Sequence, residues 1–484
     1  MPPFIDSAEQ LDNCPTKSSG YADRDRHFIG DTRHGLKAMT NYMTEYYRCP
    51  SRYAQFSIGR EMSEASGYFC FDGNTVYGRC SGLQPAKAPT DPLSNADQGV
   101  RCENGTLDFP FDLTQVIDNL RFETYLQGSG SADSTLMRLY YLLRPALPVS
   151  VRKHLQKIRL RGWEKLPFPS WPVDATVENI LNRIMLLSLR SNKAERIPFV
   201  WFWPNGASSC ALMTHDVETS LGTNLCPMLM DVNDSFGIKA SFQVIPEERY
   251  QVTPEFLHSI RHRGFEVVVH DLNHDGRLFR DRKGFVERAA KINAYGKKFG
   301  AAGFRAGVLY RNQQWYDALD FEYDMSVPNV AHLDPQRGGC CTVMPYFVGQ
   351  VLELPVTMTQ DYTLFNILND YSTELWERQI ELIMEQHGLI SVVIHPDYLT
   401  GSREKSLYQA LLTRLVNLRE KRNVWITTPG EVNRWWRDRA KMTIVEDGGG
   451  HLRIEGAGSE RACIAYASEK DGRLSMDVHG LRAS

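Results

Sequence analysis

The sequence predicts an α/β fold in which a barrel of alternating strands and helices occupies about half of the chain. From residue 196 to residue 441, short apolar segments of strand character alternate with segments of helical periodicity. Alternating elements of this length predict a parallel sheet. Roughly eight candidate strands over about 240 residues favour a closed barrel, and an open doubly wound sheet is the alternative.

The barrel elements follow one another in a regular order. The predicted strands are 211–214, 240–245, 265–269, 303–308, 323–327, 351–356, 390–394 and 424–427. The predicted helices are 223–235, 254–263, 283–299, 373–387 and 403–421. In α/β barrels the carboxyl ends of the strands form the active face, so polar residues after these strands are the first candidates for a site.

Three further regions flank the barrel, which we assign to residues 196–441. Residues 1–130 contain aromatic and β-branched runs separated by turns, as in GYFCFDGNTVYGRCSG, and predict an N-terminal β-rich module. Residues 131–195 predict a helical, basic linker region. Residues 442–484 alternate again with glycine turns and predict a small C-terminal β appendage.

The segment 144–165 carries seven lysines and arginines against a single acid, Glu164, with apolar residues between them. A basic amphipathic helix of this kind can lie on an anionic membrane surface. A helix that packs on the barrel and keeps a solvated basic face is the more common arrangement. We therefore prefer packing and keep peripheral membrane contact through 144–165 as the alternative.

Composition narrows the classes of partner and location. The 55 basic and 58 acidic residues give a net charge of −3, without the strongly basic domain that nucleic-acid binders normally show. The first residues lack the features of an export signal, and no stretch approaches the roughly 18 to 20 apolar residues of a membrane span. The ten cysteines are scattered without a C-x-x-C pair, which predicts free thiols. We expect no nucleic-acid partner and a cytoplasmic location, and nothing indicates an oligomeric state.

Three short patterns at predicted strand ends carry candidate chemistry. Asp216 and Glu218 lie in THDVE, and residues two apart in an extended chain share a face. His270 and His274 lie in HDLNH, directly after the strand FEVVV, and with a carboxylate they form a set that leaves coordination positions open, as catalytic zinc requires. His395 lies in IHPD after a later strand. A single strand-end acid or histidine is more often a loop or capping group, but the whole set predicts a functional site.

This motif series resembles that of the polysaccharide deacetylases, carbohydrate esterase family 4. The resemblance rests on Asp216 with a second acid, the H-x-x-x-H pair, Arg305 in GFRAGVLY and the late strand-end histidine, and it extends over residues 199–439. It implies a distorted (β/α)7 barrel, one bound divalent metal and hydrolysis of N-acetyl groups on amino sugars. It matches Asp216 to the catalytic base, Arg305 to the arginine that holds the base, and His395 to the catalytic acid.

The resemblance also assigns the metal ligands and one tuning residue. His270 and His274 match the two histidine ligands, and Glu218 is the candidate third ligand. Asp324 stands where the family has an acid that tunes the catalytic histidine. Zinc is the expected ion, although a site of two histidines and a carboxylate also accepts cobalt, nickel or iron.

The sequence departs from the common family pattern at three places. Val217 replaces the second of two adjacent aspartates, so that D-V-E resembles a D-x-D version with a longer arm. Gly307 replaces a proline, and the tryptophan that often follows the acid of the fourth motif is absent. These changes bear on substrate specificity more than on metal binding.

Other residues near the motifs have two interpretations. Four aromatic residues could stack on sugar rings, although aromatics near strand ends more often pack in the core: Tyr310, Trp315, Tyr362 and Tyr398. His215 could line the pocket or be hydrogen-bonded in the core. Asp361 could contact the substrate or the histidines of the site.

Three functions remain open at this point. The first is an enzyme that removes an N-acyl group from a saccharide, with an intracellular precursor as the carbohydrate substrate. The second keeps the metal site but hydrolyses another C–N bond, as in a cyclic amide or ureide. The third is a non-catalytic carbohydrate-binding protein, motivated by Val217, although a site without activity would have no need of its base, arginine and acid.

Overall fold

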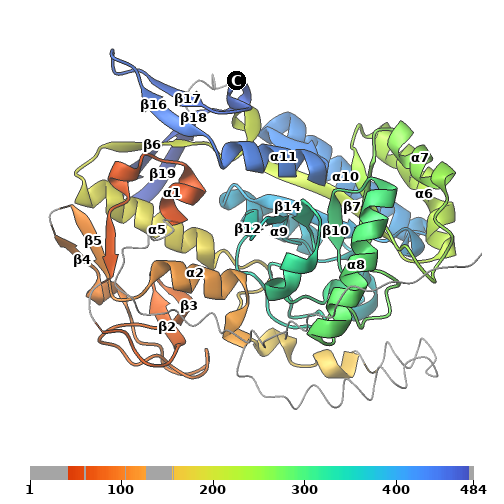
Figure 1. The fold of residues 1–484 in the computed structure, drawn as a ribbon, viewed down its shortest axis with the longest axis horizontal. Coiled ribbons are helices and arrows are strands. Elements are labelled where there is room, and N and C mark those ends of the chain that lie inside the picture. The colour runs from red at the N-terminus through yellow and green to blue at the C-terminus, as the bar shows by residue number, and fades with distance from the viewer. Residues whose placement is uncertain (1–41, 59–60, 104, 127–154, 156, 479–484) are drawn as a thin grey trace, which may run out of the picture. The chain divides into compact units, whose positions relative to one another are not determined.

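The computed structural model describes residues 42–58, 61–103, 105–126, 155 and 157–478. All of these residues belong to one unit that extends from Thr40. Its centre is a parallel sheet that curls into a barrel, with helices on the outside (Figure 1).

Seven parallel strands among the described residues follow one another around the barrel. In spatial order they are β13 (Val351–Glu353), β11 (Tyr323–Asp324), β10 (Gly303–Arg305), β9 (Glu266–His270), β8 (Ala240–Val244), β7 (Ser209–Val217) and β14 (Leu389–Ile394). The segment after β13 runs along β14, because the Met358 N–H donates to the Ser391 carbonyl at 3.2 Å and the Ser391 N–H donates to Thr357 Oγ1 at 2.9 Å. The predicted α/β barrel is therefore confirmed against the open doubly wound sheet.

The barrel is distorted on one side. β10 and β11 have only three and two residues. β12 (Tyr346–Val348) lies antiparallel beside β13, and β15 (Val424–Thr427) pairs with the first half of β7. Between β10 and β11 the described chain forms two short 3-10 helices, η7 (Gly307–Leu309) and η8 (Gln313–Ala318), in place of a full α-helix.

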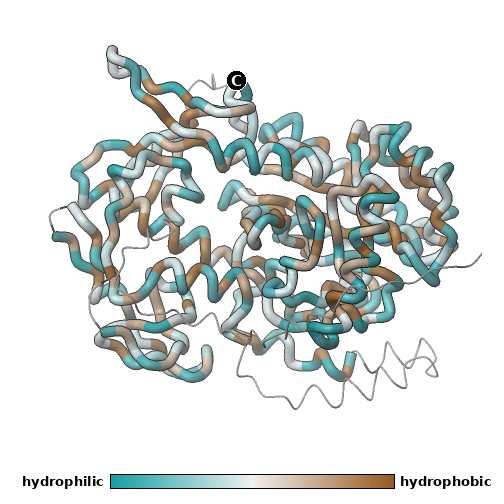
Figure 2. The backbone as a smooth tube through the Cα atoms, viewed as in Figure 1, coloured by the Kyte–Doolittle hydropathy of each residue, from teal (hydrophilic) through white to brown (hydrophobic). Residues whose placement is uncertain are grey.

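Six helices follow barrel strands, and several begin at side-chain caps. They are α6 (Ser220–Ser235), α7 (Pro254–His262), α8 (Arg282–Phe299), α9 (Glu374–Glu385), α10 (Ser402–Arg422) and α11 (Pro429–Arg439). Thr219, Thr253 and Asp281 each accept a hydrogen bond from the backbone N–H three residues later, which satisfies a donor at the start of α6, α7 and α8. Figure 2 shows hydrophilic and hydrophobic residues alternating along the outer helices, as expected of helices with one face on the sheet. The five predicted helices are confirmed, and α11 is an addition.

The described residues before the barrel form short strands and three α-helices. They are α1 (Tyr42–Tyr47), β1 (Phe56–Ile58), β2 (Gly67–Phe71), β3 (Asn74–Gly78), β4 (Arg101–Glu103), β5 (Thr106–Phe109), α2 (Leu113–Arg121) and α5 (Thr176–Ser191). β2 and β3 form a hairpin whose Asp72 and Gly73 both have positive φ, the conformation that a two-residue Asp-Gly turn requires. β1, β5 and β4 form a second sheet.

The last part of the chain forms two small sheets. β16 (Thr443–Glu446) and β17 (Leu452–Glu455) are a hairpin, and β18 (Ile464–Lys470) pairs with β19 (Arg473–Val478). β18 also pairs with β6 (Arg196–Val200), which precedes the barrel strands. β6 therefore belongs to a sheet with the C-terminal strands, while the region boundaries themselves stay a prediction.

The basic segment 144–165 lies largely outside the described residues, which include 155 and 157–165. Leu155 and Ile158 are exposed, at 40% and 44%. Arg159 donates from Nη2 to the Pro335 carbonyl at 3.1 Å, and its own carbonyl accepts from Arg337 Nη2 at 3.2 Å. Within the described chain, no helix combines the length and the apolar character needed to cross a membrane. Membrane contact stays a prediction.

Candidate metal centre at the strand ends

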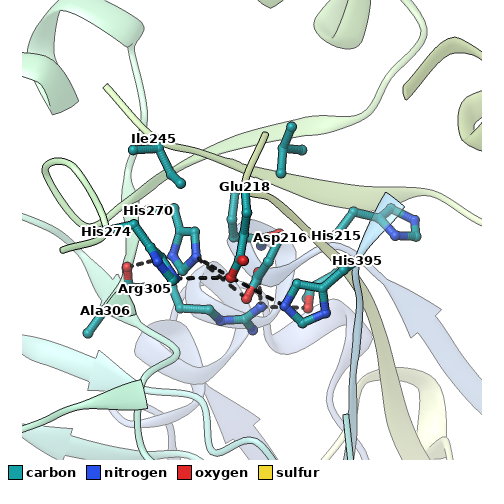
Figure 3. A network of polar contacts seen from close by, with 12 residues as sticks. His215, Asp216, Glu218, Ile245, His270, His274, Arg305, Ala306 and His395 are labelled. Carbon is teal, nitrogen blue, oxygen red and sulfur yellow. Dashed lines mark hydrogen bonds and ion pairs between the residues drawn. The ribbon is translucent and has the colours of Figure 1, made fainter. Parts of the chain in front are cut away.

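Glu218, His270 and His274 come together at the carboxyl ends of β7 and β9 (Figure 3). Their potential ligand atoms all lie within 4.8 Å of one another. Glu218 Oε1 lies 3.0 Å from His274 Nε2 and 4.0 Å from His270 Nε2. Glu218 follows β7, His270 ends β9, and a positive φ of 54° at His274 turns its loop back to the same point.

The chemistry of these side chains fits a divalent cation. Among the described residues, no group lies in hydrogen-bond geometry to the buried Nε2 atoms of His270 and His274. His270 Nδ1 lies 3.1 Å from the Arg305 carbonyl, so it carries the proton and leaves the lone pair on Nε2. Two free imidazole nitrogens beside a carboxylate oxygen form the donor set of a catalytic zinc site.

Asp216 is held beside this cluster by Arg305. Arg305 is fully buried, and its Nη1 donates to Asp216 Oδ1 at 2.6 Å and to Thr214 Oγ1 at 2.8 Å. Burial alone would raise the pKa of Asp216, but the positive charges of Arg305, His270 and His395 together outweigh burial and hold that pKa below its usual value. The second oxygen, Asp216 Oδ2, lies 3.8 Å from His270 Nε2 and is the one directed to the cluster.

His395 approaches the cluster from β14. Its Nε2 lies 3.5 Å from Glu218 Oε1, and its Nδ1 lies 2.6 Å from Asp361 Oδ1. Asp361 Oδ2 also accepts from the backbone N–H of His395 at 2.7 Å. Burial lowers the pKa of His395, but the charges of Asp361 and Glu218 outweigh it and raise the pKa well above its usual value. The imidazole is therefore fixed in orientation and favours the protonated form.

Asp324 is not the acid that contacts His395, contrary to the expectation from the motif series. Its carboxylate accepts from the Tyr316 hydroxyl at 2.9 Å and from the Ser326 N–H at 2.9 Å. In the sheet Asp324 is in register with Phe304, which packs in the core between strands and outer helices, whereas the neighbouring Arg305 points inward. Side chains alternate along a strand, so Asp324 faces the outside of the barrel and cannot reach the centre.

Asp361 is the site residue whose part in the centre the sequence left undefined. It follows β13 by eight residues, beyond the end of the regular strand, and the intervening backbone runs along β14. In the sequence, only the position of Asp361 after a predicted strand marked it as a candidate. That position does not specify a contact with His395.

His215 is a buried core residue, Trp315 is partly buried against the core, and two of the tyrosines lie beside the centre. His215 Nε2 lies 3.0 Å from Asn233 Nδ2, and burial lowers the pKa of His215 to about 4. Trp315 packs against Phe279 and Phe285, with ring centroids 6.1 and 5.5 Å away. The Tyr398 ring lies 5.1 Å from that of His395, and Tyr362 packs on Tyr398 at 5.6 Å. Tyr310 is half-buried, and its stacking role stays a prediction.

Gly307 lets the backbone after β10 pass close to the metal ligands. A Cβ atom at this position would lie 2.5 Å from Asp271 Oδ2 and 2.8 Å from His274 Cδ2. Both distances are shorter than real Cβ contacts, so a side chain here would displace His274 or its neighbour. Glycine at position 307, where the family commonly has proline, therefore leaves room for the side chains of the HDLNH loop.

Comparison with solved structures finds proteins similar to about half of this chain. A Mycobacterium smegmatis protein named as a polysaccharide deacetylase is 18% identical, with 49% of this chain and 93% of that chain covered and a TM-score of 0.41. The allantoinase PuuE is 12% identical, with coverages of 49% and 92% and a TM-score of 0.40. The peptidoglycan deacetylase PdaC of Bacillus subtilis is 14% identical, with coverages of 49% and 95% and a TM-score of 0.31. Polysaccharide deacetylases, the family that the motifs resemble, are thus among the similar structures.

No protein-family model matches the sequence, and a search of curated proteins gives no match.

Proposed function

We propose that this chain is a metal-dependent hydrolase that removes an N-acyl group from an amino sugar. The observation that carries the proposal is the convergence on one point of a metal-ligand set, an arginine-held carboxylate and an aspartate-held histidine. Hydrolysis by water needs these three functions and no covalent nucleophile.

Glu218, His270 and His274 would hold the ion, which we propose to be zinc. The ion would supply Lewis-acid chemistry, polarising the acyl carbonyl and lowering the pKa of water towards about 7. Glu218 is half-buried and has a longer side chain than aspartate, so it reaches both histidines from the end of β7.

Asp216 would accept the proton of the attacking water. Its low pKa keeps it ionised near neutral pH, and Arg305 occupies Oδ1 so that only Oδ2 is directed to the cluster. Arg305 is itself anchored, since its Nε donates to the Met325 carbonyl at 3.0 Å. The base is therefore held in one orientation before the substrate binds.

His395 would donate a proton to the departing amine. An amine leaves from the substrate only when it is protonated, and the raised pKa of His395 favours the form that can supply the proton. Asp361 accepts a hydrogen bond from His395 Nδ1, so that His395 Nε2 is directed to Glu218 and the cluster. Asp361 thus takes the tuning role that the motif series placed at Asp324.

Metal content and acetate release, measured together, test this proposal. Full-length protein purified without chelators is expected to hold one divalent ion per chain and to release acetate from oligomers of N-acetylglucosamine. Asp216→Asn is expected to keep the ion and to lose about 100- to 10,000-fold in turnover, the usual effect of removing a general base. His274→Ala is expected to lose both ion and activity.

His262→Ala is the matched control, because His258 and His262 are also four residues apart but lie exposed on α7. This variant is expected to change neither the metal content nor the release of acetate. A bound ion without acetate release, together with hydrolysis of a cyclic amide or ureide, would move the assignment to another C–N bond. Protein that binds no divalent ion would contradict both enzymatic functions and leave a binding role.

A further inference from the structure

A buried polar cluster on the outer face of β7 lies directly behind Asp216. His215 precedes Asp216 in β7, and because side chains alternate along a strand, its ring points away from the metal centre (Figure 3). Asn233 of α6 and Tyr408 of α10 complete the cluster, and all three side chains are buried. The roles proposed above for the metal ligands, the base and the acid do not use this cluster.

The His215 ring has a partner for each of its nitrogens. Nδ1 lies 3.3 Å from the Ile394 carbonyl and therefore carries the proton. Nε2 is then an acceptor, and Asn233 Nδ2 lies 3.0 Å from it. The Tyr408 hydroxyl donates to Asn233 Oδ1 at 2.8 Å, which fixes the orientation of this amide. Burial lowers the pKa of His215 to about 4, so the ring is neutral near neutral pH and keeps this pattern.

The hydrogen bond to Ile394 lies where the pairing of β7 with β14 ends. In the described chain, His215 and Ile394 are the last pair of this ladder. β7 continues to Val217 beside β8, whereas β14 gives way to a short 3-10 helix, η10 (Pro396–Tyr398). The proline that begins η10 has no N–H with which the ladder could continue. The His215 side chain thus supplies a donor to the last carbonyl of β14.

This hydrogen bond joins the two strand ends from which the base and the acid project. Arg305 orients Asp216, and Asp361 orients His395, but each of these contacts holds only one of the two side chains. The His215 hydrogen bond instead connects the residue before Asp216 with the residue before His395. Catalytic groups act together only when their separation matches the substrate, and an error of about 1 Å costs about 100-fold in rate.

We propose that His215 is a positioning residue that holds the base-bearing end of β7 and the acid-bearing end of β14 at the separation required for the reaction. Asn233 and Tyr408 act through His215, because they hold its ring in the tautomer that donates to Ile394. The proposal rests on the proposed function and adds to it a residue that does not touch the substrate.

Two substitutions of His215 separate the two hydrogen bonds of its ring. Asparagine carries an N–H near the position of Nδ1, whereas glutamine reaches only the position of Nε2, so only His215→Asn can keep the hydrogen bond to Ile394. Steady-state release of acetate from N-acetylglucosamine oligomers is measured for both variants. His215→Gln is expected to lower kcat by about 10- to 100-fold, with metal content and KM little changed. His215→Asn is expected to restore most of the loss.

His387→Gln is the matched control, because His387 makes the same kind of contact at the opposite end of the same strand pair. Its Nδ1 lies 3.1 Å from the Ser208 carbonyl, and these two residues come just before β14 and β7. His387→Gln is expected to leave kcat unchanged even where it lowers the temperature of thermal unfolding. A loss of kcat that follows stability alone, equal in His387→Gln and His215→Gln, would overturn the positioning role.

Hydrogen exchange measured by mass spectrometry follows the same strand end without turnover. The His395 N–H donates to Asp361 Oδ2 at 2.7 Å, and a peptide that contains it is expected to exchange faster in His215→Gln than in His215→Asn or the wild type. Equal kcat in the two His215 variants, or equal exchange, would overturn the positioning role alone. A wild type that releases no acetate from these sugars would overturn the proposed function, and the positioning role with it.

Discussion

Gly307 shows how one residue can set the geometry of the metal centre. We expect Gly307→Ala to push His274 out of position, because the added Cβ would lie 2.8 Å from its ring and 2.5 Å from Asp271 Oδ2. Changes in the surroundings of a metal ligand typically reduce metal affinity or activity by about 10- to 100-fold. The measurement is competition for the ion with a chelator of known affinity, followed by metal analysis.

Gly448→Ala provides the comparison for this substitution. Gly448 has an ordinary negative or extended φ and open space around its Cβ position, so alanine is accommodated there. Equal metal affinity in Gly307→Ala and Gly448→Ala would show that the loop relaxes around the methyl group, and the packing argument would then be wrong.

The sequence predicted which side chains come together wherever they lie directly at a strand end. Asp216, Glu218, His270, His274 and His395 are close together in the structure, as their positions after predicted strands indicated. Asp324 was misplaced because the face of a strand residue depends on the register with Phe304, and register cannot be read from a short strand. For Asp361 the sequence left two roles open, contact with the substrate or with the histidines, because irregular backbone separates it from β13.

On the scale of elements, a buried acid of α5 is one of its links to the barrel. Glu178 is fully buried and accepts hydrogen bonds from the Thr342 hydroxyl and, at 3.2 Å, from the Val343 N–H. Burial raises the pKa of Glu178 from 4.5 to about 7. Between these values the folded protein binds more protons than the unfolded chain, so the contribution of Glu178 to stability is present below pH 4.5 and is lost as pH rises to about 7.

Glu178→Gln removes this titration and should therefore change the pH dependence of stability. The free energy of unfolding of the wild type should fall as pH rises from 5 to 8, because Glu178 loses its proton in the folded state. The difference between variant and wild type should therefore shift in favour of the variant over this range, by up to about 3 kcal/mol. Thermal unfolding of both proteins at the two pH values measures the difference. Glu64→Gln, at an exposed position, should show no such trend, and a difference between wild type and Glu178→Gln that is independent of pH would contradict the assignment.

The predictability of the elements follows the strength of their local signals. α6, α7 and α8 were found within a few residues because capping side chains and apolar periodicity agree. β12 and α11 were missed, since a three-residue edge strand and a helix directly after a short strand have weak periodicity. The pairing of β6 with β18 joins residues more than 250 positions apart, and no local pattern specifies such a contact.

For the whole molecule, the alternation of elements predicted the barrel but not how the region before it is attached. Closure of the barrel depends on hydrogen bonds of the irregular segment near Thr357 to β14, and attachment depends on buried polar pairs. The Tyr125 hydroxyl donates to the Gly339 carbonyl at 2.6 Å, and Gln313 Nε2 donates to the Arg121 carbonyl at 2.8 Å. Such contacts form between particular side chains that are far apart in the sequence, and sequence periodicity does not predict them.

The ion pair between Glu123 and Arg311 is the strongest candidate for the interaction that fixes this attachment. Arg311 Nε donates to Glu123 Oε2 at 2.7 Å, its Nη2 donates to Oε1, and the Gly339 N–H donates to Oε1 at 2.6 Å. Both side chains are buried, at 0% and 6% exposure. Removing one member leaves the other as an unpaired buried charge, so Arg311→Met is expected to lower the free energy of unfolding by about 3 to 5 kcal/mol.

Replacing both members should cost less than the single change, because Glu123→Leu with Arg311→Met leaves neither charge buried without a partner. Chemical unfolding of the wild type, both single variants and the double variant gives the coupling free energy. Arg453→Met serves as the reference, since Arg453 and Glu455 are 63% and 50% exposed and such pairs contribute about 1 kcal/mol or less. Additive losses in the double variant would show that the two charges are stabilised independently, and the attachment would then depend on the surrounding hydrogen bonds and apolar packing.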